Sequence, residues 1–310
     1  MRVDAHIHVY PPDYMDVLAA LPGGLPPGLP VPTLRELEAT LERFAIDAAI
    51  VSLGPPGVFF GDLGQSRDLA RRVNEWFASA AAADGRLAAL ATLPLPDVEA
   101  ALVELAYALD VLGLDGVWLP TNAGGTYLGE PALAPLLDEL ARRDAYVFVH
   151  PSFPPYTTPL EWPVWLVELP FETTRAFVQL LYSGTLDRCA TVRFQLAHLG
   201  GTVPFLANRI ASLVARESRF RAAINDDPSE YLRRVWYDTG LSNTAAAVAA
   251  TSAVAGQDRI VFGTDWPYAA LPPTGDDPAP GLDLLGVTRR FVDGANVTPL
   301  VPRFGEKEKQ

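Results

Sequence analysis

The segment Asp4-Ala5-His6-Ile7-His8 decides how the fold and the chemistry of this chain are interpreted. It lies in an apolar run from Val3 to Tyr10, a pattern typical of a buried β-strand. Because side chains alternate along a strand, Asp4, His6 and His8 are expected to share one face. Two neutral imidazoles that lie so close together suit zinc and related transition metals. The segment therefore predicts a first strand that carries a metal site.

The other two histidines of the chain support this interpretation. His150 ends the apolar run Tyr-Val-Phe-Val-His, and His198 ends the run Arg-Phe-Gln-Leu-Ala-His, so both are expected at strand ends. Asp265 follows another apolar run, in Gly-Thr-Asp-Trp-Pro. A lone histidine in a strand is usually a core residue, and Asp265 on its own could be a helix cap. All four histidines at strand pairs or strand ends favour metal binding instead.

Apolar runs and helical periodicity alternate along the whole chain. Strands are predicted at 3–9, 48–53, 87–93, 116–119, 146–150, 193–199, 235–240 and 259–263, and helices at 33–44, 66–83, 97–112, 132–143, 172–186, 204–216, 244–254 and 282–292. Eight strand–helix units predict a (β/α)8 barrel, with an open doubly wound sheet as the alternative. In a barrel the carboxyl ends of the strands face one cup, which would bring the four histidines and Asp265 together.

Two long connections are expected to be irregular. Residues 11–32 are rich in proline and glycine, which disfavours regular structure. Residues 151–170 form a connection of 20 residues with several aromatic side chains, and a loop of that length usually covers a site. No shift in composition marks a domain boundary, so residues 1–310 are expected to form a single domain.

Composition excludes several classes of function. The net charge of −13 argues against nucleic acids and anionic membranes as partners, and no apolar run approaches the ~20 residues of a membrane helix. The only lysines are Lys307 and Lys309, which excludes lysine chemistry within the folded body. One cysteine, Cys189, excludes a disulfide framework and favours a reducing cytoplasm. The predicted strand at the start leaves no room for a signal peptide.

The metal site is predicted to be catalytic. With His6, His8, His150 and Asp265 as ligands, a divalent ion keeps one net positive charge and room for a water or a substrate oxygen. His198 is then expected to act as a base or hydrogen-bond donor. Asp4 is expected either to orient a histidine from behind or to bond the backbone at the strand entry.

The motifs Asp-x-His-x-His, His150-Pro151, His198-Leu-Gly-Gly and Gly-Thr-Asp265-Trp-Pro resemble the amidohydrolase superfamily, in its amidohydrolase-2 branch. The segments at 171–176, 180–186 and 196–206, together with Tyr237-Asp-Thr, resemble its decarboxylase members, those for 6-methylsalicylate and aminocarboxymuconate semialdehyde. The resemblance covers essentially the whole chain. It implies one divalent metal, usually zinc and in some members manganese, and no organic cofactor.

The same resemblance implies roles for individual residues. His6, His8, His150 and Asp265 would bind the metal, and His198 would be the acid or base beside it. Arg209 matches an arginine that reaches across a homodimer interface to a substrate carboxylate; its alternative role is that of a solvated helix residue. Trp162 resembles an aromatic residue of the substrate pocket.

The substrate is expected to be a flat, largely apolar aromatic acid. The chain lacks the arginine that the semialdehyde decarboxylases place between the first strand and the first helix, which argues against a second carboxylate. The loops instead supply aromatic side chains that would line the pocket, namely Tyr10, Phe59, Phe60, Phe153, Tyr156 and Trp162.

Two reactions fit this site. One is non-oxidative decarboxylation of a salicylate-like or enolic acid, with the metal on the carboxylate and the adjacent oxygen and a proton delivered by Asp265 or His198. The other is hydrolysis of an amide, lactone or ester by metal-bound hydroxide. Strand 116–119 ends without a lysine or an acid, which disfavours binuclear hydrolases, and the central segments favour decarboxylation. A binding protein without turnover would not need both His198 and Asp265.

Overall fold

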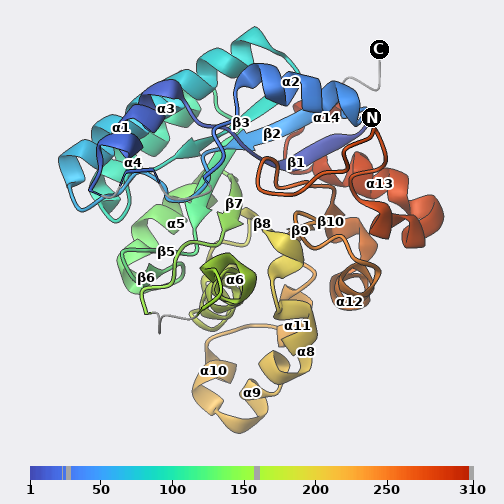
Figure 1. Cartoon of the computed structure of the whole chain (residues 1–310). Helices are drawn as coiled ribbons and strands as arrows, with labels where there is room; N and C mark the ends of the chain where they lie inside the picture. Colours follow the sequence, from blue (N-terminus) through green and yellow to red (C-terminus); the bar gives the residue numbers. More distant parts are fainter. Residues whose placement is uncertain (23, 26–28, 157–160, 307–310) are drawn as a thin grey trace.

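The computed structural model describes residues 1–22, 24–25, 29–156 and 161–306, and it shows a (β/α)8 barrel (Figure 1). Its eight parallel strands lie side by side in chain order: β1 (Val3–His8), β2 (Ala48–Ser52), β3 (Leu87–Thr92), β4 (Gly116–Pro120), β7 (Tyr146–His150), β8 (Arg193–Leu196), β9 (Trp236–Asp238) and β10 (Ile260–Val261). A hairpin of β5 (Asn122–Ala123) and β6 (Thr126–Tyr127) follows β4.

Backbone hydrogen bonds between the two ends of the sheet close the ring. The segment after β10 returns to β1 through three bonds of 2.8 Å, from Ala5 to Phe262, from His8 to Trp266 and from Asp265 to His6. An open doubly wound sheet would leave these edges apart, so the barrel is confirmed over the alternative. The closure also fixes Asp265 next to the histidines of β1.

Helices surround the strands. The longer ones are α1 (Pro12–Ala20), α2 (Leu34–Arg43), α3 (Leu63–Ala83), α4 (Val98–Ala106), α5 (Ala134–Arg142), α6 (Val164–Tyr182), α8 (Val203–Ala211) and α12 (Ala245–Ala255). Shorter turns are η1 (Tyr107–Val111), η2 (Pro131–Leu133), α7 (Thr185–Arg188), η3 (His198–Gly200), α9 (Leu213–Arg216), α10 (Ser218–Ala222), α11 (Pro228–Tyr231), η4 (Gln257–Arg259), η5 (Pro280–Thr288), α13 (Arg289–Asp293), η6 (Ala295–Val297) and α14 (Arg303–Glu306). No helix among the described residues is both long and apolar enough to span a bilayer.

Local sequence explains where several helices begin. Thr33 and Glu36 form the predicted capping box of α2, with the side chain of each accepting a hydrogen bond from the backbone of the other. Asp62 and Asp97 are the N-caps of α3 and α4, where the side chain of each accepts one hydrogen bond from a backbone N–H of the first turn. After α8 the chain continues through α9, α10 and α11, which form a protrusion at the bottom of Figure 1.

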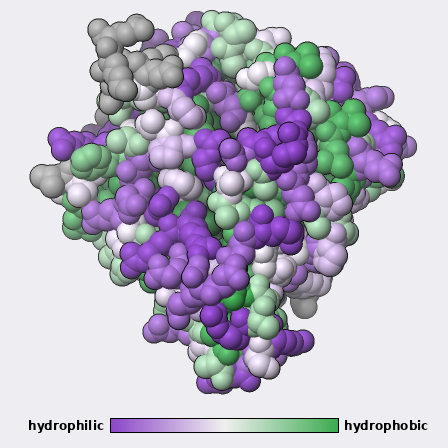
Figure 2. All heavy atoms as spheres, turned by 180° about the vertical axis from the view of Figure 1, so that it is seen from behind, coloured by the Kyte–Doolittle hydropathy of each residue, from purple (hydrophilic) through white to green (hydrophobic). Residues whose placement is uncertain are grey.

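Alternation along the strands separates two hydrophobic layers. Residues such as Ile50, Leu90 and Phe148 fill the inside of the barrel, where the carboxyl-terminal Leu300 and Phe304 join them. The opposite side chains of the same strands pack against the helices. Figure 2 shows the face away from the viewer of Figure 1, where hydrophilic residues cover most of the centre and hydrophobic ones gather mainly at the upper right.

The prediction that residues 11–32 lack regular structure is wrong for α1. Its proline occupies the first helical turn, where a missing N–H costs no hydrogen bond. Tyr14, Met15 and Leu18 are buried on one side of the helix, which supplies the apolar face it needs. Residues 23 and 26–28 of this predicted loop lie outside the described part of the chain.

The connection after β7 is shorter than predicted. Helix α6 begins at Val164 and contains Pro170, whereas the sequence predicted a loop to residue 170 and a helix from residue 172. Pro170 forfeits only the bond to the carbonyl of Leu166, whose side chain is exposed. Residues 157–160 of the predicted loop, like Lys307 and Lys309, lie outside the described residues.

Two other predicted helices differ in extent. The helix predicted at 204–216 divides into α8 and α9. That predicted at 282–292 is mostly the 3-10 turn η5, because Gly286 has a φ of 57° and interrupts it, and only α13 is α-helical.

An irregularity in β1 changes the predicted faces. Asp4 pairs with Ala49 and Ile7 with Val51, so three steps along β1 match two along β2. The extra residue is a β-bulge, which shifts the alternation. The expectation that Asp4 shares a face with His6 and His8 is therefore wrong. Asp4 pairs with Ala49, whose side chain belongs to the outer layer, and paired residues of parallel strands face the same way.

Candidate metal centre

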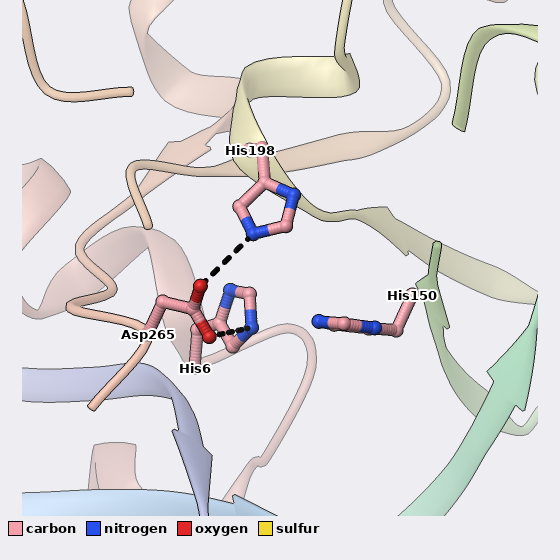
Figure 3. Close-up of side chains that lie close together, drawn as sticks. All are labelled: His6, His150, His198 and Asp265. Atoms are coloured by element: carbon pink, nitrogen blue, oxygen red, sulfur yellow. Dashed lines mark hydrogen bonds and ion pairs between the residues drawn. The ribbon is translucent and has the colours of Figure 1, made fainter. Parts of the chain in front are cut away.

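Five predicted site residues meet at the carboxyl ends of the strands. His6 and His8 come from β1, His150 ends β7, His198 lies in η3 after β8, and Asp265 follows β10. All five side chains are buried. Figure 3 shows His150 and His198 pointing toward Asp265 and His6 from separate segments of the chain.

Three imidazole nitrogens and one carboxylate oxygen converge on a point. The Nε2 atom of His8 lies 3.1 Å from that of His6 and 3.2 Å from that of His150. The Oδ1 atom of Asp265 lies 3.1 Å and 3.3 Å from the Nε2 atoms of His6 and His8. This oxygen is buried, and the two ring nitrogens are its nearest polar neighbours. A divalent cation would satisfy all four atoms.

The far nitrogen of each of these rings has an acceptor. The Nδ1 atom of His6 lies 2.8 Å from Asp238 Oδ1, that of His150 lies 2.9 Å from the carbonyl oxygen of Pro151, and that of His8 lies 3.2 Å from Ser52 Oγ. Each ring can therefore carry its proton on Nδ1 and turn the Nε2 lone pair inward. This is the arrangement that metal-binding histidines adopt.

Burial and neighbouring charges shift the pKa values of the site residues in different directions. Burial lowers the pKa of His8, and it lowers that of His150 well below its ordinary value, so both rings are neutral. Burial opposes ionisation of Asp265, but the nearby histidines outweigh it and hold its pKa well below the usual range. At His6 burial opposes protonation, yet Asp238 and Asp265 raise the pKa to about 10. The field at this point thus favours positive charge.

His198 approaches the centre from the other side of Asp265. Its Nε2 atom lies 3.2 Å from Asp265 Oδ2, while Oδ1 faces His6 and His8. Its backbone has a φ of 58°, and its N–H donates to Asp238 Oδ1 at 3.3 Å. Donor atoms of His6, His150, His198 and Asp265 also lie within 4.8 Å of one another. The donor set thus fits a single metal ion, and the division into ligands and base stays a prediction.

Asp238 is a site residue that sequence reasoning did not identify. It ends β9 with both oxygens occupied, one by His6 Nδ1 and one by the amide of Gln195 at 2.9 Å. Burial opposes its charge, but His6 lowers its pKa below the ordinary value. Its position at a strand end, in Tyr-Asp-Thr, was the available signal.

Asp4 contacts backbone rather than a histidine ring. Its Oδ1 accepts from the N–H groups of His6 and Thr264 at 3.0 Å each, and its Oδ2 accepts from Thr264 Oγ1 at 2.6 Å. Burial raises its pKa to about 7. These bonds join the bulge of β1 to the turn that carries Asp265.

A cleft of about 440 Å³ lies on the His150 side of the centre, although none of the five site residues lines it. Trp118 lines it, and the Trp118 ring lies 6.1 Å from that of His150. Two of the six predicted aromatic pocket residues, Phe59 and Phe153, also line the cleft. No charged side chain is present among the described residues that line it.

The other predicted substrate residues do not line this cleft. Tyr10 makes a short hydroxyl–hydroxyl contact with Tyr268, whose ring lies 5.7 Å from that of His8. Phe60 packs against the outer core. The exposed Tyr156 ring lies beneath Arg175 and its hydroxyl reaches the buried Glu172. Trp162 is exposed before α6, and Arg209 is exposed on α8.

The amidohydrolase family model matches residues 3–291. The chain belongs to the amidohydrolase family. Among curated relatives of this amidohydrolase, 6-methylsalicylic acid decarboxylase acuB from Aspergillus aculeatus is 36% identical over 284 residues, which cover 87% of this chain and 85% of that protein.

Solved structures of other proteins have the same fold as this amidohydrolase. The apo IDCase of Metarhizium anisopliae has a TM-score of 0.84 at 26% identity, with 99% of this chain and 98% of that chain covered. A dihydroxybenzoic acid decarboxylase from Polaromonas sp., solved with bound manganese and the inhibitor 2-nitroresorcinol, has a TM-score of 0.80 at 20% identity, with 97% and 96% covered.

Proposed function

We propose that this amidohydrolase is a metal-dependent non-oxidative decarboxylase of a small aromatic, salicylate-like carboxylic acid. One observation carries the proposal: three imidazole Nε2 atoms and a buried carboxylate oxygen converge near an uncharged cleft that is lined in part by aromatic residues. The curated relative from Aspergillus aculeatus acts on an acid of this kind. The proposal treats residues 1–310 as one catalytic domain.

A few residues would carry out metal binding, orientation of the histidine rings and proton transfer. His6, His8, His150 and Asp265 would hold a divalent cation, which would neutralise the substrate carboxylate and polarise it. Asp238, Ser52 and the carbonyl of Pro151 keep the three rings in place. The Nε2 atom of His198 lies 3.2 Å from Oδ2 of Asp265, where the ring would act as the acid or base. A proton would reach the ring carbon from His198, either directly or through Asp265, as the bond of that carbon to the departing carbon dioxide breaks.

We propose zinc as the metal, with manganese as the alternative, and no organic cofactor. Nitrogen donors outnumber oxygen donors by three to one in this set, which suits zinc better than magnesium or calcium. We also propose a cytoplasmic location, because the single cysteine is buried as a free thiol.

The reaction is tested by incubating the purified protein with substituted salicylates and measuring carbon dioxide release, beside a panel of lactones, esters and amides. We expect carbon dioxide release that falls below about 1% after the metal is chelated and returns with zinc or manganese. Metal analysis of the untreated protein identifies the native ion. Turnover of the lactones, esters or amides without carbon dioxide release would establish the hydrolase instead.

We further propose a homodimer formed through α6 and α8, which contact each other. Trp165 and Leu166 on α6 are exposed, Phe205 on α8 is 87% exposed, and Arg209 lies one turn further along α8. Exposed apolar side chains gathered on one face are typical of interfaces. Arg209 would then be available to the site of the partner.

Light scattering after gel filtration tests the dimer. The wild-type protein is expected at twice the chain mass, and Phe205→Asp is expected to yield monomer because it buries a charge at the interface. Val103→Asp, at another exposed apolar position, on α4, is the control and should remain dimeric. Arg209→Gln should lower kcat/KM about tenfold while the dimer persists. A monomeric wild-type protein contradicts the proposal.

A further inference from the structure

Two buried polar atoms on neighbouring strands lack a hydrogen-bond partner among the described residues. They are Oγ1 of Thr92, a fully buried residue, and the indole Nε1 of Trp118, a residue that is 4% exposed. Buried polar groups in folded proteins are almost always hydrogen-bonded, because burial removes the water that would otherwise bind them. Two such atoms on paired residues of adjacent strands point to a ligand.

The register of the sheet brings these two side chains together. Thr92 on β3 pairs directly with Trp118 on β4. Leu90 and Trp118 both belong to the inner layer of the barrel, and Thr92 follows Leu90 by two residues, so it faces the same way. Trp118 lines the cleft and its ring lies 6.1 Å from that of His150, so it lies between the cleft and the metal centre. Thr92 does not line the cleft itself and is next to it through its pairing with Trp118.

The hydroxyl of Thr92 and the indole N–H of Trp118 determine which kind of ligand atom can bind between them. An indole N–H can only donate, whereas a threonine hydroxyl can donate or accept. Together they fit an oxygen atom with free lone pairs. No described residue that lines the cleft carries a charge, so a second carboxylate would be desolvated without a counterion. The oxygen should therefore be uncharged, as in a hydroxyl, ether or carbonyl group.

We propose that Thr92 and Trp118 form a polar notch that binds an uncharged oxygen substituent on the ring of the substrate, other than the oxygen beside the carboxylate. The inference rests on the proposed function, because it assumes an aromatic acid at the metal. The notch makes the enzyme selective for ring substituents: at one ring position, oxygen is preferred over a methyl group of similar size.

The test measures affinity rather than turnover. The probes are 2-nitrophenols that carry either a hydroxyl or a methyl group at each remaining ring position, because a nitro group has the planar shape of a carboxylate and cannot leave as carbon dioxide. Calorimetry with the metal-loaded protein gives the Kd of each probe. At one ring position we expect the hydroxyl probe to bind about tenfold or more tightly than the methyl probe. Thr92→Val and Trp118→Phe should each bring that ratio to about one.

Two control variants distinguish loss of recognition of the oxygen substituent from a general effect of removing a buried polar atom. Trp236→Phe removes another buried indole N–H without a partner, on β9, where the side chain lines a different pocket. Ser66→Ala removes another unpartnered buried hydroxyl, on α3. Both should leave the hydroxyl-to-methyl ratio unchanged.

Three outcomes would contradict the proposed notch. The first is that the probes do not bind, the second is that the Kd ratio of methyl to hydroxyl probe is near one at every ring position in the wild-type protein, and the third is that the Kd values of both probes change equally in the Thr92 and Trp118 variants. The last result would mean that the pair binds a structural water. The proposed function is tested separately, by carbon dioxide release. Selective binding of the hydroxyl probe without decarboxylation would contradict the proposed reaction and leave the notch supported.

Discussion

His198→Ala is expected to leave the metal content near one equivalent per chain while kcat falls by about 10²–10⁴-fold, the range for removal of a general acid or base. The physical reason is the position of the ring. His198 Nε2 contacts Oδ2 of Asp265, whereas Oδ1 faces His6 and His8. Loss of the ring should therefore remove a proton donor without opening the metal site.

The backbone at His198 calls for a second variant. Its φ of 58° is in the left-handed region, which asparagine tolerates better than alanine does. His198→Asn thus keeps the turn while it removes the imidazole. Metal analysis, circular dichroism and kcat are measured for both variants. If the metal leaves both proteins, His198 is a ligand, as the cluster it forms with His6, His150 and Asp265 allows, and the assignment as acid or base is wrong.

The barrel was predictable because its signals are local and repeated. Each strand is a short apolar run bounded by turn residues, and the capping box of Thr33 and Glu36 marks the start of α2 directly. The errors come from tertiary context. Tyr14 and Leu18 make α1 stable within a proline-rich segment by burying an apolar face, and that burial depends on packing partners elsewhere in the chain.

The candidate site likewise has features that local sequence predicts and features that depend on tertiary context. The four histidines and Asp265 could be chosen from their residue types and their places at strand ends, and the structure brings them together. The bulge in β1 could not be predicted, because alternation carries no sign of an inserted residue. Asp238 required knowledge of which ring nitrogen needs an acceptor, which only the assembled barrel reveals.

Asp265→Asn is expected to have the largest effect of any single substitution at the centre. The change preserves shape, and asparagine accepts the φ of 62° at this position, so the fold should survive. It removes the negative charge that faces the Nε2 atoms of His6 and His8. We expect most of the metal to be lost on dialysis and carbon dioxide release to fall by more than about 10³-fold, because the proposed ligand and a residue of the proposed proton path are lost together.

Asp238→Asn is the matched control, since it removes an equally buried carboxylate that also contacts His6, but through the outer nitrogen. Its effect on metal affinity should be about 10–100-fold, as for other residues that orient a metal-binding histidine. Competition with a chromophoric chelator gives the affinity of each variant. The expected order is wild type, then Asp238→Asn, then Asp265→Asn. An Asp265→Asn protein that binds metal as tightly as the wild type would remove Asp265 from the ligand set.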